Sequence, residues 1–237
     1  MTELDFAFYS DVGGRSDNED AYLAKQLPGG SLFIVADGLG GHDSGEMASS
    51  SAVHGVKEYL LRTPGADVAA AIQYANEVVL DLQQKLSSKM KTTVALALVT
   101  EEKTVIAHVG DTRVYAFSGG KILRRTLDHS ASQLAVSVGE IRPEDIRTHE
   151  DRNILIRALG AGEQVKVDSF TLDNRDFSAL LLCSDGFWEY VLEDEMESAL
   201  ASTKTAEKWL YQMRAIQLRK APQKCDNNTA IAVMLPR

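Results

Sequence analysis

The sequence predicts an α+β protein in which two β-sheets carry helices on their outer sides. Strand-like segments cluster at both ends of the chain and in its middle, and paired helical segments lie between them. The order is not the strict strand–helix alternation of a doubly wound parallel sheet. The 237 residues can bury one sizeable core, and no linker, repeat or low-complexity tract divides them. We therefore expect residues 1–237 to form a single domain.

The first half of the chain is expected to begin with strands and to continue with two helices. Apolar runs and loose alternation predict strands at 4–10, 22–27 and 31–36. Asp43 is a residue type favoured at a helix N-cap, with Glu46 as its box partner, so a helix should begin there and end near Arg62. Apolar residues at alternating spacings of four and three predict a second, core-facing helix over 68–86.

Hairpins and a less regular segment precede the C-terminal helices. Strand patterns around short turns predict hairpins of 93–100 with 104–109 and of 113–117 with 122–124. Short helices are expected on either side of Gly139, at 130–138 and 143–150. The remaining expected elements are strands at 165–172, 179–183 and 229–235 and helices at 193–201 and 205–221.

Charge, cysteine content and hydropathy narrow the possible partners and compartments. The formal net charge of −9 makes the protein a poor general partner for nucleic acid or an anionic membrane. Cys183 and Cys225 have no metal-ligand or redox spacing, and Cys183 ends an apolar run typical of a buried thiol. The sequence shows no secretory signal and no run of the roughly 20 apolar residues that a membrane span needs. We expect a cytoplasmic protein.

The stretch 31–47, SLFIVADGLGGHDSGEM, organises the rest of the chain. It is typical of a buried strand that ends at Asp37, followed by a glycine turn and a helix start. Gly38, Gly40 and Gly41 permit backbone angles and close approaches that a side chain would forbid. An Asp-Gly pair after a strand is often an ordinary turn. A carboxylate beside bare glycine backbone is also well placed to hold a hard cation through oxygen ligands.

Other acidic residues share this sequence context. Asp111, Asp185 and Asp226 each follow or precede an apolar strand and border glycine or asparagine. Glu19 and Asp20 stand in the loop RSDNED. Each residue taken alone could be an ordinary turn former. Their recurrence predicts that strand ends converge on one acidic site, where cations offset the repulsion between packed carboxylates.

Short motifs occur in a fixed order along essentially the whole chain. They are Arg15-Ser-Asp-Asn-Glu-Asp20, Asp37-Gly-Leu-Gly-Gly-His42, Thr92-Thr93, Val109-Gly-Asp-Thr-Arg113, Asp128-His-Ser130, His149-Glu-Asp-Arg-Asn153, Arg157-Ala-Leu-Gly160, Ser184-Asp-Gly-Phe-Trp188 and Asp226-Asn-Asn-Thr229. In order and approximate spacing this set resembles a bacterial member of the metal-dependent protein phosphatase (PPM) family, the type 2C serine/threonine phosphatases. The resemblance implies a β-sandwich of two mainly antiparallel sheets flanked by helix pairs, with a flap beside the active site at about 131–150. It also implies hydrolysis of phosphoserine and phosphothreonine in proteins.

The resemblance further implies a set of metal ligands. Asp37 would bridge two Mn²⁺ or Mg²⁺ ions. Asp185 and Asp226 would complete the protein ligands of one ion, and Gly38, through its carbonyl, and Glu19, through water, would serve the other. Both cations take oxygen ligands and keep several waters. Two ions that share a carboxylate can lower the pKa of a bridging water, which then attacks phosphorus without a covalent enzyme intermediate.

The resemblance places further residues around this pair of ions. Asp20 would lie behind the ligands, and Asp111, with Asp185, would hold a third ion. Arg15 would bind the substrate phosphate, a role that a bidentate guanidinium suits better than an ammonium group. His42 is a candidate for substrate contact or proton transfer, the alternative being a histidine that merely begins the helix.

The sequence departs from the family pattern at a few positions. Lys91 stands where relatives usually have a glycine, which puts the local backbone geometry in question. Thr112 replaces a serine in the VGDSR motif, and Leu39 stands where animal members carry a histidine proposed as the general acid. His129 and His149 are expected to hold turns.

The motifs of other phosphatase classes can be sought in the sequence. Neither cysteine has an arginine six positions later, as a cysteine phosphatase requires, and no Asp-x-Asp or Walker A pattern is present. One rival interpretation is a non-catalytic binding domain, against which the intact acidic residues argue. Another is a phosphatase dedicated to one regulatory partner. We expect a monomer that acts on phosphorylated protein substrates and opposes a serine/threonine kinase.

Overall fold

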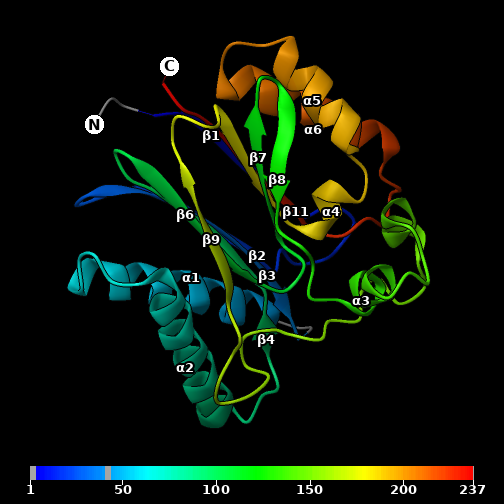
Figure 1. The fold of residues 1–237 in the computed structure, drawn as a ribbon. Helices are drawn as coiled ribbons and strands as arrows, with labels where there is room; N and C mark the ends of the chain where they lie inside the picture. Colours follow the sequence, from blue (N-terminus) through cyan, green and yellow to red (C-terminus); the bar gives the residue numbers. More distant parts are fainter. Residues whose placement is uncertain (1–3, 41–43, 237) are drawn as a thin grey trace.

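Two antiparallel β-sheets stack face to face, and helices cover the outer face of each sheet (Figure 1). The structure is a computed structural model and describes residues 4–40 and 44–236. The layered arrangement confirms the predicted α+β class and the sandwich of two antiparallel sheets.

The strands form two sheets with different members. The first sheet has the order β1 (Asp5–Asp11), β11 (Asn228–Met234), β10 (Ala179–Cys183), β7 (Arg113–Ser118) and β8 (Lys121–Arg125). The second has the order β2 (Asp20–Leu27), β3 (Gly30–Leu39), β5 (Val94–Val99), β6 (Lys103–Val109) and β9 (Asp168–Asp173), with the short β4 (Lys91–Thr92) paired to the end of β3.

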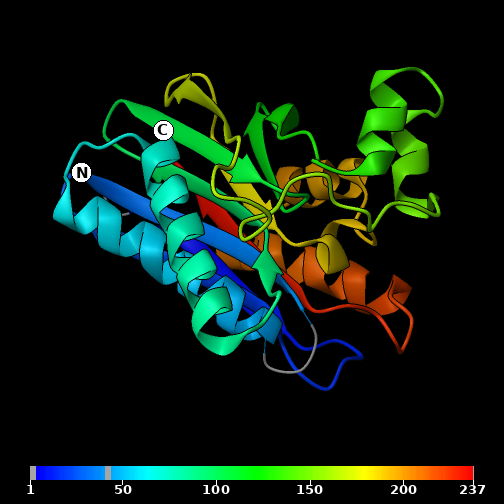
Figure 2. The ribbon, with the colours of Figure 1, turned by 90° about the horizontal axis from the view of Figure 1, so that it is seen from below.

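Each sheet has its own pair of covering helices. The second sheet is covered by α1 (Ser44–Arg62) and α2 (Val68–Leu86), which cross its outer face in Figure 2. The first sheet is covered by α5 (Glu193–Ala201) and α6 (Ala206–Lys220). The short helix α3 (Ala131–Ser137) and the 3₁₀ helix η1 (Pro143–Thr148) stand to one side of the sandwich in both views. None of the helices in the described ranges is long and apolar enough to cross a membrane.

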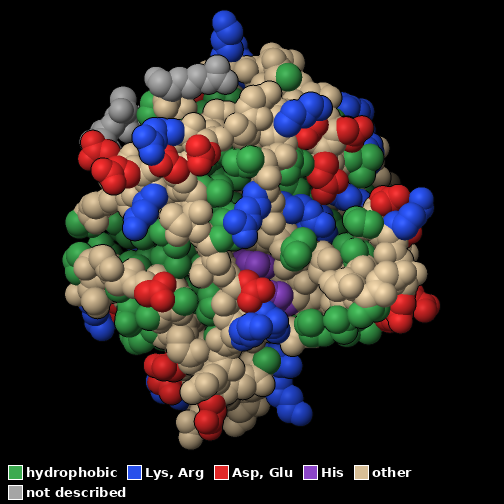
Figure 3. All heavy atoms as spheres, viewed as in Figure 1, with side chains coloured by type: hydrophobic (Ala, Val, Ile, Leu, Met, Phe, Trp, Pro, Cys, Tyr) green, Lys and Arg blue, Asp and Glu red, His purple; other side chains and the backbone are tan. Residues whose placement is uncertain are grey.

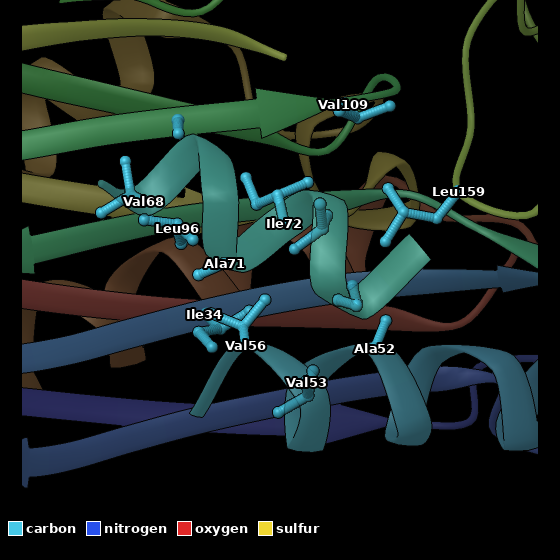
Figure 4. Close-up of a cluster of buried hydrophobic side chains, with 14 of the residues drawn as sticks. Ile34, Ala52, Val53, Val56, Val68, Ala71, Ile72, Leu96, Val109 and Leu159 are labelled. Atoms are coloured by element: carbon cyan, nitrogen blue, oxygen red, sulfur yellow. The ribbon is translucent and has the colours of Figure 1, made fainter. Parts of the chain in front are cut away.

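Apolar side chains form three buried layers, one between the sheets and one under each helix pair. On β3, Phe33 and Val35 belong to the layer between the sheets, whereas Leu32 and Ile34 belong to the layer under α1 and α2. Figure 4 shows Ile34 close to Val56 of α1. A strand buried on both faces has no polar side to alternate with its apolar side. This explains why 31–36 is a continuous apolar run in the sequence.

Strand pairing brings the acidic residues to one end of the sandwich. In the antiparallel pair β2–β3, Asp20 lies directly opposite Asp37. In the other sheet, the last residue of β10 pairs with the first residue of β7 and with a residue near the start of β11. Asp111, Asp185 and Asp226 therefore lie where the chain leaves or enters that sheet, at the same end of its strands. The predicted convergence of strand ends follows from this antiparallel register.

The end of β3 differs from the sequence prediction. The strand was expected at 31–36 with a glycine turn after Asp37, but it continues to Leu39 because Gly38 and Leu39 pair with β4. The sequence analysis missed β4, which includes Lys91. In the described part of the chain Ser87 is the non-glycine residue with positive φ, so the lysine at 91 needs no strained backbone. His42 and the predicted N-cap Asp43 lie outside the described residues.

Several other predicted boundaries need correction. β2 begins at Asp20 rather than 22 because its pairing with β3 extends to Asp37, and β9 begins at Asp168 rather than 165. The segment 143–148 is a 3₁₀ helix. Asp185 begins a one-turn helix, α4 (Asp185–Trp188), which the sequence analysis did not predict.

Candidate active site

A cleft of about 430 Å³ opens at the end of the sandwich where the acidic loops meet. The charged residues that line it are Arg15, Asp17, Glu19, Asp37, Asp111, Asp185 and Asp226. Gly38, Leu39, Gly40, Asn153, Leu155 and Asn227 are among its other lining residues. The structure therefore brings most of the predicted site residues into one cavity.

Asp37 is held by its main chain, which leaves its carboxylate directed at the cleft. Its backbone N–H donates to Thr93 Oγ1 (2.9 Å), and its carbonyl accepts from Thr93 N (2.8 Å) and from Thr92 Oγ1 (2.8 Å). The Thr92-Thr93 pair of the sequence motifs thus satisfies the backbone of Asp37. A second hydroxyl, that of Thr112, lies 2.6 Å from Thr93 Oγ1, so threonine serves well in the VGDTR motif.

Hydrogen bonds to its backbone N–H and to its backbone carbonyl hold Glu19 in place. Its backbone N–H donates to Asn227 Oδ1 (2.8 Å), and its carbonyl accepts from Gly38 N (3.1 Å) and Ser49 Oγ (2.6 Å). Its carboxyl group packs against Gly45 in the first turn of α1, where an added Cβ would lie 2.4 Å from the Glu19 carboxyl carbon. Only glycine at position 45 allows this approach.

Asp20 lies behind the cleft rather than in it. Its side chain is buried, and Oδ2 accepts from Ser184 Oγ (2.7 Å), the residue directly before Asp185. The same hydroxyl accepts from Thr229 N (3.0 Å) on β11. Asp20 therefore braces the segment that leads to Asp185.

Arg15 and Asp226 form a pair that the sequence analysis did not anticipate. Arg15 Nε donates to Asp226 Oδ1 (3.0 Å) and its Nη2 to Oδ2 (2.6 Å), so both carboxylate oxygens are engaged. The Arg15 side chain remains 58% exposed at the mouth of the cleft. Exposed ion pairs of this kind contribute roughly 0–1 kcal/mol, so competing ligands can separate them.

The carboxylates of the cleft destabilise one another's charged forms. Burial and the neighbouring carboxylates raise the pKa values of Asp37 and Asp185 well above the ordinary range. Burial, together with the charge of Asp128, raises the pKa of Asp111 to about 7, and burial raises that of Asp20 to about 6. Cation binding would offset both causes.

The donor set fits hard cations. In the cleft, Oδ1 of Asp185 is buried and has no hydrogen-bond partner in the described ranges, and the same holds for Oδ1 of Asp20 behind it. Oxygen donors of this kind are what Mg²⁺ and Mn²⁺ take. Within residues 4–40 and 44–236 no three acidic, histidine or cysteine side chains are yet gathered closely enough to hold one ion. The pairing of both Asp226 oxygens with Arg15 is one visible reason.

The raised pKa values predict an unusual pH dependence of stability in the metal-free protein. Between pH about 4 and 7 the folded state holds protons on Asp111 and Asp20 that the unfolded chain has lost, so the free energy of unfolding falls as pH rises through this window. Each pKa unit corresponds to about 1.4 kcal/mol. We expect the melting temperature in EDTA to be several degrees lower at pH 8 than at pH 5, and Mn²⁺ to raise it at pH 8. Equal melting temperatures in EDTA at the two pH values would contradict this prediction.

Sequence reasoning missed some residues of the cleft. Asn227 joins the loops, because its Nδ2 donates to the carbonyls of Val12 (2.8 Å) and Asp17 (2.9 Å) while Oδ1 accepts from Glu19 N. The Asp-Asn-Asn motif was the signal for it. Asn153 and Leu155 come from the segment after η1. Asn153 ends the motif His149-Glu-Asp-Arg-Asn153 but had no role assigned to it, and no motif includes Leu155. His149 holds a turn as predicted, since its Nδ1 accepts from Asp151 N (3.1 Å).

Comparisons with known proteins agree with this fold and site. The family model described as protein phosphatase 2C matches residues 10–224. The serine/threonine phosphatase stp of Listeria monocytogenes is 37% identical over 205 residues, which cover 82% of this chain and 78% of the relative. The crystal structure of serine/threonine phosphatase Stp1 from Staphylococcus aureus has a TM-score of 0.91 at 31% identity and covers 100% of this chain and 96% of that one. The catalytic domain of serine/threonine protein phosphatase PstP, solved with 2 manganese ions, has a TM-score of 0.83 at 28% identity, covering 98% and 97% of the two chains.

The fold, the acidic cleft and these matches define a metal-dependent phosphoprotein phosphatase. The chain belongs to the protein phosphatase 2C family, as its ordered motifs indicated.

Proposed function

We propose that this protein hydrolyses phosphoserine and phosphothreonine in proteins with Mn²⁺ or Mg²⁺ as cofactor. The observation that carries the proposal is the convergence of Asp37, Asp111, Asp185 and Asp226 on one cleft with the exposed Arg15 guanidinium at its mouth. The relatives described above are serine/threonine phosphatases, which supports the substrate class.

The cleft residues divide into holders of cations and a holder of phosphate. We assign the two core ions to Asp37, Asp185 and Asp226, with the Gly38 carbonyl and Glu19, through water, completing the second ion's set. When bound, such ions activate a water for attack on phosphorus and polarise the phosphoryl oxygens. Asp185 would also share a third ion with Asp111.

Arg15 would exchange one anion for another during binding. In this structure its guanidinium pairs with Asp226, and a phosphate group offers the same bidentate geometry with more charge. A phosphate held by Arg15 would release the Asp226 carboxylate toward a cation. Substrate and metal would therefore support each other's binding. His42, outside the described residues, remains our candidate for contact with the substrate or for proton transfer.

The rest of the chain would act as one catalytic domain with a flap at about 131–150. We propose a monomer that acts on proteins phosphorylated by a serine/threonine kinase. The face shown in Figure 3 supports protein rather than nucleic-acid partners, because Lys and Arg side chains are interspersed there with Asp and Glu side chains. By removing phosphate groups that the kinase adds, the enzyme would act in signalling.

The proposed function is tested by hydrolysis of p-nitrophenyl phosphate with Mn²⁺, with Mg²⁺ and after chelation, beside Asp185→Ala. Because Asp185 would contribute to more than one ion, we expect turnover that requires metal and falls roughly 10²-fold or more in the variant. Phosphoserine and phosphothreonine peptides should then be hydrolysed under the same metal dependence. Folded wild-type protein without turnover under any metal would favour a binding domain, and turnover that survives chelation would mean that the site is wrong.

A further inference from the structure

Two tryptophans are fully buried, and each donates its indole N–H to a main-chain carbonyl. Trp188 Nε1 donates to the carbonyl of Asp111 (3.0 Å), and Trp209 Nε1 donates to the carbonyl of Met196 (3.1 Å). Their exposed fractions are 1% and 0%. The two side chains are therefore equivalent in burial and hydrogen bonding, but the carbonyl that Trp188 reaches belongs to a residue that lines the cleft, and the carbonyl that Trp209 reaches does not.

The position of Trp188 in the chain gives this hydrogen bond a geometric consequence. Helix α4 carries Asp185 at its first residue and Trp188 at its last. The indole N–H thus ties the loop of Asp111 to the helix that carries Asp185. Asp111 precedes β7 and Asp185 follows β10, the strand paired with β7, and both residues line the cleft. A hydrogen bond at the far end of so short a helix restricts how far apart the two carboxylates can move.

A buried arginine holds the Trp188 ring in place. The guanidinium carbon of Arg113 lies 3.5 Å from the ring centroid, a close cation–π contact. Arg113 follows Asp111 by two residues and is itself fixed by the buried Asp128 at 2.6 Å. The ring and the Asp111 loop are therefore joined both through the N–H and through this stacking.

The flap is attached to the same tryptophan. Arg147, on η1, donates through Nε to the carbonyl of Trp188 (2.9 Å) and through Nη2 to Glu193 Oε2 (2.8 Å). Its guanidinium carbon is 5.9 Å from the Trp188 ring centroid, and the side chain is only 12% exposed. A displacement of η1 would act on the residue that positions Asp111.

We propose that Trp188 is a positioning residue that sets the Asp111 carboxylate against that of Asp185 for cation binding, and that Arg147 makes this setting depend on the position of the flap. The inference rests on the proposed function of the cleft. It assigns to the indole N–H a role in metal affinity that packing alone would not require.

The test compares Trp188→Phe with Trp209→Phe, which loses the equivalent hydrogen bond away from the cleft. Manganese binding is measured by calorimetric titration without substrate, and folding by urea midpoints. We expect both variants to lose similar stability, and only Trp188→Phe to raise the Mn²⁺ concentration that half-saturates the weakest site, by roughly 3- to 10-fold, the size expected from one buried hydrogen bond. An unchanged titration in Trp188→Phe, or an equal shift in Trp209→Phe, would overturn the proposal.

A double variant shows whether Trp188 acts through Asp111. Asp111→Asn keeps the carbonyl that accepts the indole N–H but removes the carboxylate. In that background Trp188→Phe should still lower the urea midpoint but should no longer shift the manganese titration, because coupled residues are not additive. A full additional shift in the double variant would contradict a role through Asp111.

The flap part of the proposal has its own variant. Arg147→Met keeps a long side chain against the ring and removes the donors to Trp188 and Glu193. We expect it to shift the manganese titration in the same direction as Trp188→Phe, and less than additively with it. A flap that acts independently of Trp188 would give additive shifts. If wild-type protein shows no metal-dependent phosphatase activity, the proposed function fails; if it is active and only these shifts are absent, this inference fails alone.

Discussion

Replacing Asp37 by asparagine is expected to reduce metal-dependent turnover of p-nitrophenyl phosphate by roughly 10³-fold while making the metal-free protein more stable. The loss of activity follows because Asp37 is assigned to both core ions, and removal of even one preorganised charge-stabilising group in an active site costs about 10²–10³ in rate. The gain in stability follows because burial and the charges of Asp185, Asp20 and Asp111 raise the pKa of Asp37. An amide of the same shape removes that repulsion.

The two opposite effects are measured on the same preparation. Initial rates are recorded across Mn²⁺ concentrations, and thermal unfolding is followed in EDTA at pH 8, where we expect a gain of about 1 kcal/mol. Asp173→Asn is the matched control, because Asp173 is at the end of β9 and its partner is the neighbouring Arg175 at 2.6 Å. The control should leave turnover unchanged. An Asp37→Asn protein that keeps wild-type turnover, or that melts at a lower temperature in EDTA, would contradict the assignment.

Local patterns repeated at strand ends were sufficient for two sheets with outer helices and for the acidic residues of the cleft, whereas the sandwich of antiparallel sheets was implied by the family resemblance. Asp37, Asp111, Asp185 and Asp226 each stand beside an apolar strand, and antiparallel pairing then requires those ends to meet. The clear helix over 68–86 was predicted with its observed bounds because an amphipathic helix shows its period directly in the sequence.

What the sequence did not reveal depends on contacts between distant residues. The extension of β3 to Leu39 requires a partner strand of two residues, too short to have a pattern of its own. Asn153 and Leu155 reach the cleft only because the chain returns from η1 past its mouth. The pairing of Arg15 with Asp226 joins residues 211 positions apart. No periodicity signals such contacts.

The motifs that contain Arg113 and Asp128 supported the family resemblance, but the sequence analysis assigned no role to these two residues. The structure places them in contact. Arg113 Nε and Nη2 donate to the two oxygens of Asp128 at 2.8 and 2.6 Å, and both side chains are only 1% exposed. Nη1 donates to Tyr115 Oη at 3.0 Å. The charges of Arg113 and Asp128 thus compensate each other, and water reaches neither side chain.

Breaking this buried pair should strongly reduce stability. Asp128→Leu would leave the Arg113 guanidinium buried without its main counter-charge, and we expect a loss of about 3–5 kcal/mol in the free energy of unfolding, measured by urea denaturation with Mn²⁺ present. Arg113→Met should cost less than this, because Arg125 Nη1 already lies 3.9 Å from Asp128 and can turn toward the abandoned carboxylate.

The double variant Arg113→Met with Asp128→Leu separates two contributions to the free energy of unfolding. One is the net contribution of the ion pair, and the other is the cost of leaving one charge buried without its partner. Replacing a whole buried ion pair by apolar side chains of similar volume is often close to neutral. We therefore expect the double variant to recover most of the stability lost in Asp128→Leu. Its metal affinity should nevertheless stay below that of the wild type, because the Trp188 ring would have lost the cation that holds it over the Asp111 loop. A double variant as unstable as the single one would mean that the region depends on shape at these positions rather than on compensated charge.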